Sequence, residues 1–185
     1  LFLASIVFAA GSADAMAAHA KHTHKPQAPA AAAPAQPPGP PRPVLVELYT
    51  SQGCSSCVAA DALMGQLADR RDLLALSLPI TYWDMLGWKD TLATNANTNR
   101  QKAYAETMGR GGVYTPQMIV DGVNDLVGSR EPAIEAAVTA READMDAVPI
   151  TVTTTAKEVH IDVAAGDGAD ATIWLFRILP KATLT

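Results

Sequence analysis

The sequence contains few aromatic residues and few cysteines, and it lacks a long apolar run. Phe, Trp and Tyr make up 5% of the 185 residues, so we expect a core built mainly from aliphatic side chains and alanine. No apolar stretch reaches the roughly 18 residues that a transmembrane helix requires. Two cysteines cannot support a disulfide-dense scaffold, but both belong to one Cys-x-x-Cys motif.

Positive charge is also scarce in the main body of the chain. Residues 44–185 hold 11 of the 14 Lys/Arg and 18 of the 19 Asp/Glu, which gives this part a net charge of −7. Proteins that bind nucleic acids usually present a basic surface to the phosphate backbone. We therefore expect no nucleic-acid partner.

Residues 1–20 are predicted to be a signal peptide. An apolar run over residues 1–10 is followed by small residues suited to cleavage, at Ala13 and Ala15 or at Ala15 and Ala17. The basic region that normally precedes such a run is missing, so we interpret the sequence as truncated at its start. A buried N-terminal helix is the alternative. The signal predicts a periplasmic or secreted protein with no membrane anchor after cleavage.

Residues 21–43 are predicted to form an extended linker. Eight of the 13 prolines lie within residues 1–43, and alanine fills most of the gaps between them. Such a composition favours an extended, polyproline-like chain and cannot bury a core. His19, His22 and His24 are candidates for loose binding of Cu(II) or Zn(II), although a solvated basic tether also explains them.

Residues 44–147 are predicted to form one α/β domain, because their apolar patterns predict the element order β-α-β-α-β-β-α. The expected strands are at 44–49, 73–80, 118–120 and 126–128, with an Asp-Gly turn signal at 121–122 between the last two. Helices are expected at 58–67, 94–108 and after residue 129. The Cys-x-x-Cys motif falls between the first strand and the first helix. Together these features indicate a thioredoxin-like fold, a central mixed sheet flanked by helices.

Residues 148–185 are predicted to form an added β-module. Apolar residues alternate over 150–154 and 159–163, and a further run at 173–176 follows a Gly-Asp-Gly turn. We expect antiparallel strands here, and we interpret the module as truncated at its C-terminal end. His160 is interpreted as a surface residue of one of these strands.

Cys54 and Cys57 are the strongest candidates for chemistry. Two cysteines three residues apart at the start of a helix approach closely enough for a disulfide. The free N–H groups and partial positive charge of a helix N-terminus stabilise a thiolate. We therefore expect Cys54 to be the exposed attacking thiol and Cys57 the resolving thiol. An inert structural disulfide is the alternative; zinc is disfavoured because no second cysteine or histidine pair lies at ligand spacing, and no cofactor is expected.

Three motifs make the chain similar to a known family. They are residues 46–57 (VELYTSQGCSSC), residues 82–84 and 86–90 (YWD and LGWKD), and residues 113–118 and 120–122 (VYTPQM and VDG). Over about residues 44–176 the chain resembles the secreted bacterial proteins called domain of unknown function 1223, within the thioredoxin-like superfamily. The resemblance implies a thioredoxin-like fold and export. It implies little about activity, because the family has no established substrate.

The resemblance to thioredoxin-like proteins singles out Thr115 and Pro116. In those proteins a cis-proline precedes the third core strand and lies beside the cysteine pair, which leaves a backbone edge open to a substrate peptide. We therefore expect a cis Thr115–Pro116 bond near the cysteines, with both residues in the substrate-binding surface. A trans proline that merely opens a strand is the alternative.

Glu47 and three aromatic residues complete the candidate site. Thioredoxins carry a buried acid six residues before the first cysteine, where this chain has Leu48. Glu47 is therefore either a proton acceptor for the cysteines or an ion-paired strand residue. Tyr82, Trp83 and Trp88 follow the second expected strand, at the end of the sheet where the cysteines should lie. They either form the wall of a binding cleft or pack their loop onto the second helix.

Three hypotheses about function follow from these residues. The first, which we take as the prediction, is thiol–disulfide exchange with exported protein thiols or with a redox partner protein, through Cys54 and Cys57. The second is a metallochaperone whose two thiolates bind Cu(I), with the histidine tail collecting Cu(II). The third is a non-catalytic binding module in which the aromatic segment contacts a partner and the disulfide is structural.

Overall fold

The computed structural model describes residues 42–143, 150–164 and 172–180. The predicted signal peptide and residues 21–41 of the predicted linker, with His19, His22 and His24, lie outside the described residues. The chain divides into two units, with residues 34–147 in one and residues 148–185 in the other.

The larger unit is built on a four-stranded mixed sheet with the strand order β2-β1-β3-β4. Its strands are β1 (Val44–Thr50), β2 (Leu73–Pro79), β3 (Gln117–Val120) and β4 (Asn124–Val127). Strand β1 runs parallel to β2 and antiparallel to β3, and β3 runs antiparallel to β4. Because β1 is paired on both edges and covered on both faces, its almost continuous apolar sequence is what a central strand needs.

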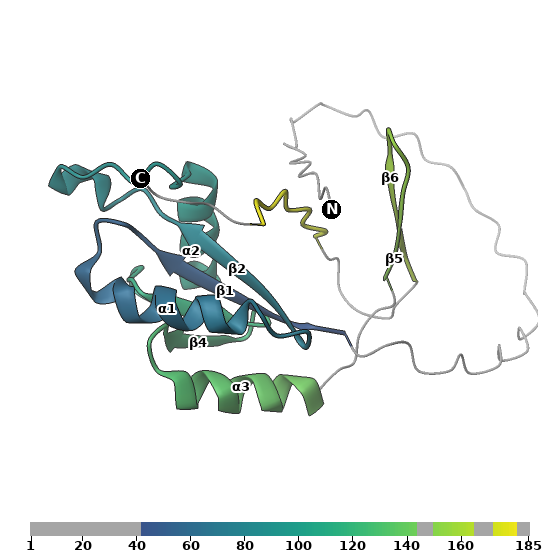
Figure 1. Cartoon of the computed structure of the whole chain (residues 1–185), viewed down its shortest axis with the longest axis horizontal. Coiled ribbons are helices and arrows are strands. Elements are labelled where there is room, and N and C mark those ends of the chain that lie inside the picture. Colours follow the sequence, from purple (N-terminus) through teal and green to yellow (C-terminus); the bar gives the residue numbers. More distant parts are fainter. Residues whose placement is uncertain (1–41, 144–149, 165–171, 181–185) are drawn as a thin grey trace, which may run out of the picture. The chain divides into compact units, whose positions relative to one another are not determined.

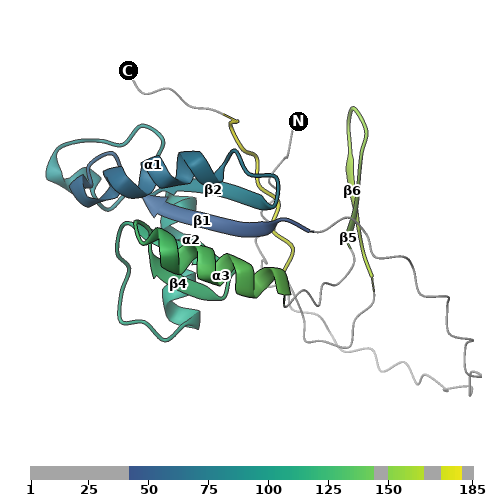
Figure 2. The same ribbon diagram turned by 60° about the horizontal axis from the view of Figure 1, so that its bottom comes forward.

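Helices cover both faces of this sheet (Figures 1 and 2). Helices α1 (Val58–Leu67) and α3 (Glu131–Ala143) lie on one face, and α2 (Asn95–Thr107) lies on the other. Two short 3-10 turns, η1 (Ser55–Cys57) and η2 (Asp84–Leu86), follow β1 and β2. The aliphatic core fills the space between the sheet and α1 and α3. No helix within the described residues is long and apolar enough to span a membrane.

The Asp-Gly turn predicted between the third and fourth strands is present. Asp121 and Gly122 both have positive φ angles, 50° and 72°, and the N–H of Val123 donates to the carbonyl of Val120 at 3.0 Å. Two successive positive φ values give the backbone twist that a tight hairpin requires, and Asp-Gly tolerates them better than most pairs. The turn therefore fixes how β4 returns along β3.

The face of β1 that meets α2 carries a buried ion pair. The side chain of Glu47 is 0% exposed and accepts hydrogen bonds from Arg100 Nε at 2.7 Å and from the Tyr104 hydroxyl at 2.7 Å. Alternation along β1 turns Glu47 away from the face covered by α1, where Leu48 packs. Of the two roles considered for Glu47, its position therefore fits the ion-paired strand residue and not an acid beside Cys57.

The smaller unit contains a two-stranded antiparallel sheet of β5 (Ile150–Thr154) and β6 (Val159–Val163). His160 lies on β6 with an exposed side chain, as expected. The third strand expected at residues 173–176 is wrong, because residues 172–180 form no regular secondary structure. An apolar run becomes a strand only where a partner strand accepts its backbone hydrogen bonds, and neither sheet of the described residues includes residues 173–176.

Replacement of Gly128 by alanine should destabilise the larger unit. A Cβ atom at this position would lie 2.8 Å from Leu48 Cδ1 and 3.1 Å from Pro116 Cβ. Overpacking of this kind costs about 1–3 kcal/mol, so urea unfolding of Gly128→Ala should show that loss. Gly65→Ala is the matched control, because a Cβ there meets nothing within 4 Å and alanine favours the helix by up to about 1 kcal/mol. Equal stabilities of the two variants would contradict this packing.

Loss of the Glu47 carboxylate should also destabilise the unit. In Glu47→Gln the partly buried guanidinium of Arg100 loses the negative charge of Glu47, and breaking such a pair costs about 3–5 kcal/mol. Thermal or urea unfolding at neutral pH measures the loss. Asp72→Asn removes the exposed ion pair with Arg70 and should change the free energy of unfolding far less. A Glu47→Gln variant as stable as the wild type would show that the ion pair does not stabilise the fold.

Candidate functional site

The two cysteines are joined by a disulfide at the junction of β1 and α1. The bond links Cys54 to Cys57, whose Cα atoms are 5.4 Å apart. A tight turn makes this approach possible: Cys54 N–H donates to Ser51 O and Cys57 N–H donates to Cys54 O, both at 3.1 Å. Cys57 lies at the end of η1, directly before Val58, the first residue of α1.

Both cysteines are buried in this disulfide form. Cys54 is 3% exposed and Cys57 is 0% exposed. The expectation that Cys54 is exposed is therefore wrong for the oxidised protein. The reason is local packing, because the hydroxyl groups of Thr115 and Ser56 lie 3.2 and 3.3 Å from Cys54 Sγ.

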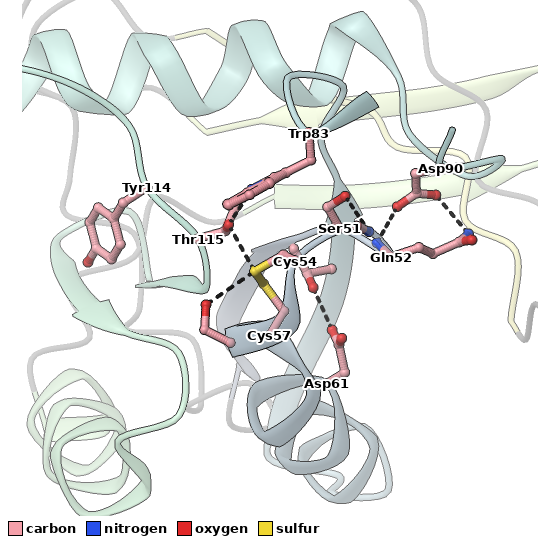
Figure 3. The surroundings of a disulfide bond; sticks show 12 residues. Ser51, Gln52, Cys54, Cys57, Asp61, Trp83, Asp90, Tyr114 and Thr115 are labelled. Carbon is pink, nitrogen blue, oxygen red and sulfur yellow. Dashed lines mark hydrogen bonds between the residues drawn. A yellow bond between two sulfur atoms is a disulfide. The ribbon is translucent and has the colours of Figure 1, made fainter. Parts of the chain in front are cut away.

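The segment before β3 reaches the disulfide as predicted. The Thr115–Pro116 bond is cis, which confirms the expectation, and Thr115 Oγ1 donates to Cys54 Sγ at 3.2 Å. The segment is held from α2, since Gln101 Nε2 donates to Tyr114 O at 2.7 Å and to Gln117 Oε1 at 2.8 Å. Figure 3 shows Thr115 beside the disulfide and the ring of Tyr114 turned away from it.

The three predicted aromatic residues have different positions. Trp83 is half-buried, and its Nε1 donates to Thr115 Oγ1 at 2.8 Å, so its ring lies close to the disulfide (Figure 3). Tyr82 is half-buried too, and burial raises the pKa of its hydroxyl. Trp88 is 64% exposed and donates from Nε1 to Gln52 Oε1 at 3.2 Å. Trp83 thus belongs to the wall of the site, whereas Trp88 remains free on one side to contact another molecule.

The residue that holds the loop before the cysteines, Asp90, is not among the site residues predicted from the sequence. Asp90 is 2% exposed, and its carboxylate accepts hydrogen bonds from Gln52 N, Gln52 Nε2 and Leu92 N, each at 2.9 Å. These contacts tie the cysteine loop to the segment that follows η2 (Figure 3). The available signal was an acidic residue directly after the aromatic segment. Its partner Gln52 lies 38 residues away, so spacing alone does not reveal the contact.

A second carboxylate lies in the first turn of α1. Thr50 Oγ1 donates to Asp61 Oδ1 at 2.7 Å and so connects the end of β1 to the helix (Figure 3). Burial raises the pKa of Asp61 above its ordinary value, the hydrogen bond from Thr50 opposes this, and the negative charge of Asp90 adds to the increase. Asp61 is therefore a carboxyl group on the helix that follows the cysteines, whereas Glu47, the proton acceptor suggested by the sequence, is paired with Arg100 of α2.

The described residues do not contain a group of three or more His, Cys, Asp and Glu side chains arranged to hold a metal ion. The side chains around the disulfide are hydroxyl, amide, indole and carboxyl groups. They suit hydrogen bonding to sulfur and to peptide groups.

Comparisons with known proteins complete the description of the site. The crystal structure of protein AGR_C_4864 from Agrobacterium tumefaciens is 41% identical in sequence, with a TM-score of 0.61. The match covers 68% of this chain and 57% of that one, so the chain spans less than two thirds of the length of this relative. The search of curated proteins found no match. The model of the family described as protein of unknown function DUF1223 matches residues 45–185, and the chain therefore belongs to this family.

Proposed function

We propose that the chain is a thioredoxin-like protein that carries out thiol–disulfide exchange with protein thiols through Cys54 and Cys57. One observation carries this proposal. A disulfide at the strand-to-helix junction has one sulfur in hydrogen-bond contact with Thr115, the residue before a cis-proline. Two segments that are distant in sequence thus meet at a sulfur atom, as an exchange site would require.

The arrangement of the sheet supports the thioredoxin-like assignment. The strand order β2-β1-β3-β4 and the helices on both faces agree with the element order on which the sequence-based assignment rests. The disulfide lies at the end of the central strand β1, and Pro116 directly precedes its neighbour β3. Loops at this end of a sheet commonly carry functional residues, because the sheet fixes their positions.

The proposed exchange proceeds in two steps. A substrate thiolate attacks Cys54 Sγ, a substrate–Cys54 disulfide forms, and Cys57 leaves as a thiolate. A second substrate thiolate then attacks the substrate sulfur of that mixed disulfide and releases Cys54 as a thiolate. The substrate loses two electrons and gains a disulfide, and the protein gains two electrons. Because Cys54 is 3% exposed, the first step requires local displacement of the side chains that cover it.

An apolar surface near the site supports a protein substrate. Met85, Leu86 and Trp88 are 85%, 66% and 64% exposed, and they lie on η2 or directly after it. Trp88 contacts Gln52, two residues before Cys54. Exposed apolar side chains that lie close together favour contact with another protein. We propose exported protein thiols or a redox partner protein as the partner, bound against Trp88 and the Thr115–Pro116 segment.

Substitution of each cysteine tests the exchange directly. Exchange is reversible, so the Cys54 thiolate of Cys57→Ser should attack the disulfide of an oxidised substrate protein. The mixed disulfide should accumulate, because no Cys57 thiol remains to displace the bound protein. Cys54→Ser should accumulate few, because Cys57 is completely buried. Non-reducing electrophoresis and mass spectrometry of adducts after acid trapping measure the difference.

Equal trapping by the two variants, or trapping by neither, would argue against exchange. The reduction potential gives an independent answer, because a structural disulfide usually lies below about −300 mV and a working couple above it. Tight anaerobic binding of Cu(I) by the reduced protein without exchange would favour the metallochaperone hypothesis instead.

The proposal includes export, since the apolar run at the start of the sequence has the pattern of a signal peptide. Mature protein recovered from the periplasm should begin between about Met16 and Lys21, with small residues before the cleaved bond. Intact-mass analysis measures this start. Retention of residues 1–10 in the mature protein would rule out cleavage at these sites.

A further inference from the structure

Two hydroxyl groups converge on one sulfur of the disulfide. Thr115 Oγ1 lies 3.2 Å from Cys54 Sγ, and Ser56 Oγ lies 3.3 Å from the same atom. A disulfide sulfur carries no hydrogen, so it can only accept and both hydroxyl groups must donate. Within residues 42–143 no hydrogen bond reaches Cys57 Sγ. The two sulfurs are therefore in different environments before any reaction begins.

Trp83 determines which way the Thr115 hydroxyl points. An indole nitrogen is a donor only, so at 2.8 Å from Trp83 Nε1 the Thr115 oxygen must act as acceptor. The single hydrogen of that hydroxyl is then left for Cys54 Sγ. Figure 3 shows these two contacts, from Trp83 to Thr115 and from Thr115 to Cys54. Asp90 and Gln101 hold the two segments that carry Trp83 and Thr115.

The Ser56 hydroxyl has no comparable constraint. Ser56 is exposed and sits in the same short turn as Cys54, so water competes for its hydrogen bonds. Trp83 and Thr115 are half-buried, and hydrogen bonds are stronger where water is partly excluded. Of the two hydroxyl groups, that of Thr115 is therefore the more firmly oriented toward Cys54 Sγ.

We infer that Trp83 is a positioning residue which, through Thr115, aims a hydroxyl hydrogen at Cys54 Sγ and makes Cys54 the sulfur that carries the negative charge after reduction. When a substrate dithiol transfers two electrons to the disulfide, the S–S bond breaks and two thiolates form. Near neutral pH one proton binds to the pair, and it goes to Cys57 because the Thr115 hydrogen bond already stabilises charge on Cys54. This inference deepens the proposed exchange by naming what distinguishes its two sulfurs.

Alkylation of Cys54 in the Cys57→Ser background tests the inference, because this background contains a single thiol. Thr115→Val should raise the pH midpoint of iodoacetamide labelling by about one unit, equivalent to about tenfold less thiolate at a fixed pH. Trp83→Phe, which keeps an aromatic ring without the N–H, should raise it by about half as much. The two substitutions together should shift it no more than Thr115→Val alone, because without the hydroxyl there is nothing to orient.

Three further variants control the experiment. Thr115→Ser keeps the hydroxyl and should keep the labelling midpoint of the parent. Trp88→Phe removes an indole N–H that is bonded to Gln52 rather than directed at sulfur, and it should leave the midpoint unchanged. Trp83→Leu also removes the indole N–H but replaces the ring with an aliphatic side chain. It can therefore be used for the test if circular dichroism shows that Trp83→Phe does not fold.

An unshifted midpoint in folded Trp83→Phe or Trp83→Leu would overturn the inference, as would additive shifts in the double variant. Labelling of the reduced protein needs no substrate. A shifted midpoint therefore supports the role of Trp83 even if no protein thiol is oxidised, whereas exchange with an unshifted midpoint rejects the role of Trp83 and leaves the exchange intact.

Discussion

The geometry around the disulfide depends on the burial of one carboxyl group. Asp90 is almost completely buried, and a carboxyl group in such a place is costly unless its oxygens are hydrogen bonded. Gln52 supplies two of the donors and Leu92 the third. The backbone N–H of Asp90 in turn donates to Asp84 Oδ1 at 3.0 Å, which ties it to η2. The cysteine loop and the aromatic segment therefore cannot move independently, and Trp83 is kept beside Thr115 and Cys54.

Features set by local sequence could be predicted. The central strand was recognisable because a strand buried on both faces needs a continuous apolar run, and the hairpin before α3 because Asp121-Gly122 suits positive φ angles. The position of the cysteine pair between strand and helix followed from the same patterns. The placement of Thr115–Pro116 beside the pair required the family resemblance in addition.

Features set by long-range contacts could not be predicted. Sequence patterns do not distinguish Trp83, which reaches the disulfide, from Trp88, which stays largely exposed, because both lie in one irregular segment. The burial of Cys54 depends on Thr115, which is 61 residues away, and the role of Asp90 depends on Gln52. The run at 173–176 was assigned to a strand from its composition, but pairing needs a neighbour that composition cannot supply.

The ion pair of Glu47 with Arg100 makes the two faces of β1 chemically different. Strand residues alternate between faces, so a shift of β1 by one residue would place a carboxylate in the aliphatic cluster and Leu48 against a guanidinium. That penalty disfavours a one-residue shift from the observed pairing of β1 with β3, in which Leu48 pairs with Met118 and Tyr49 with Gln117. Cys54 follows β1 and Thr115 precedes β3. The ion pair on the face covered by α2 therefore contributes to the strand alignment that brings the Thr115 hydroxyl to Cys54 Sγ.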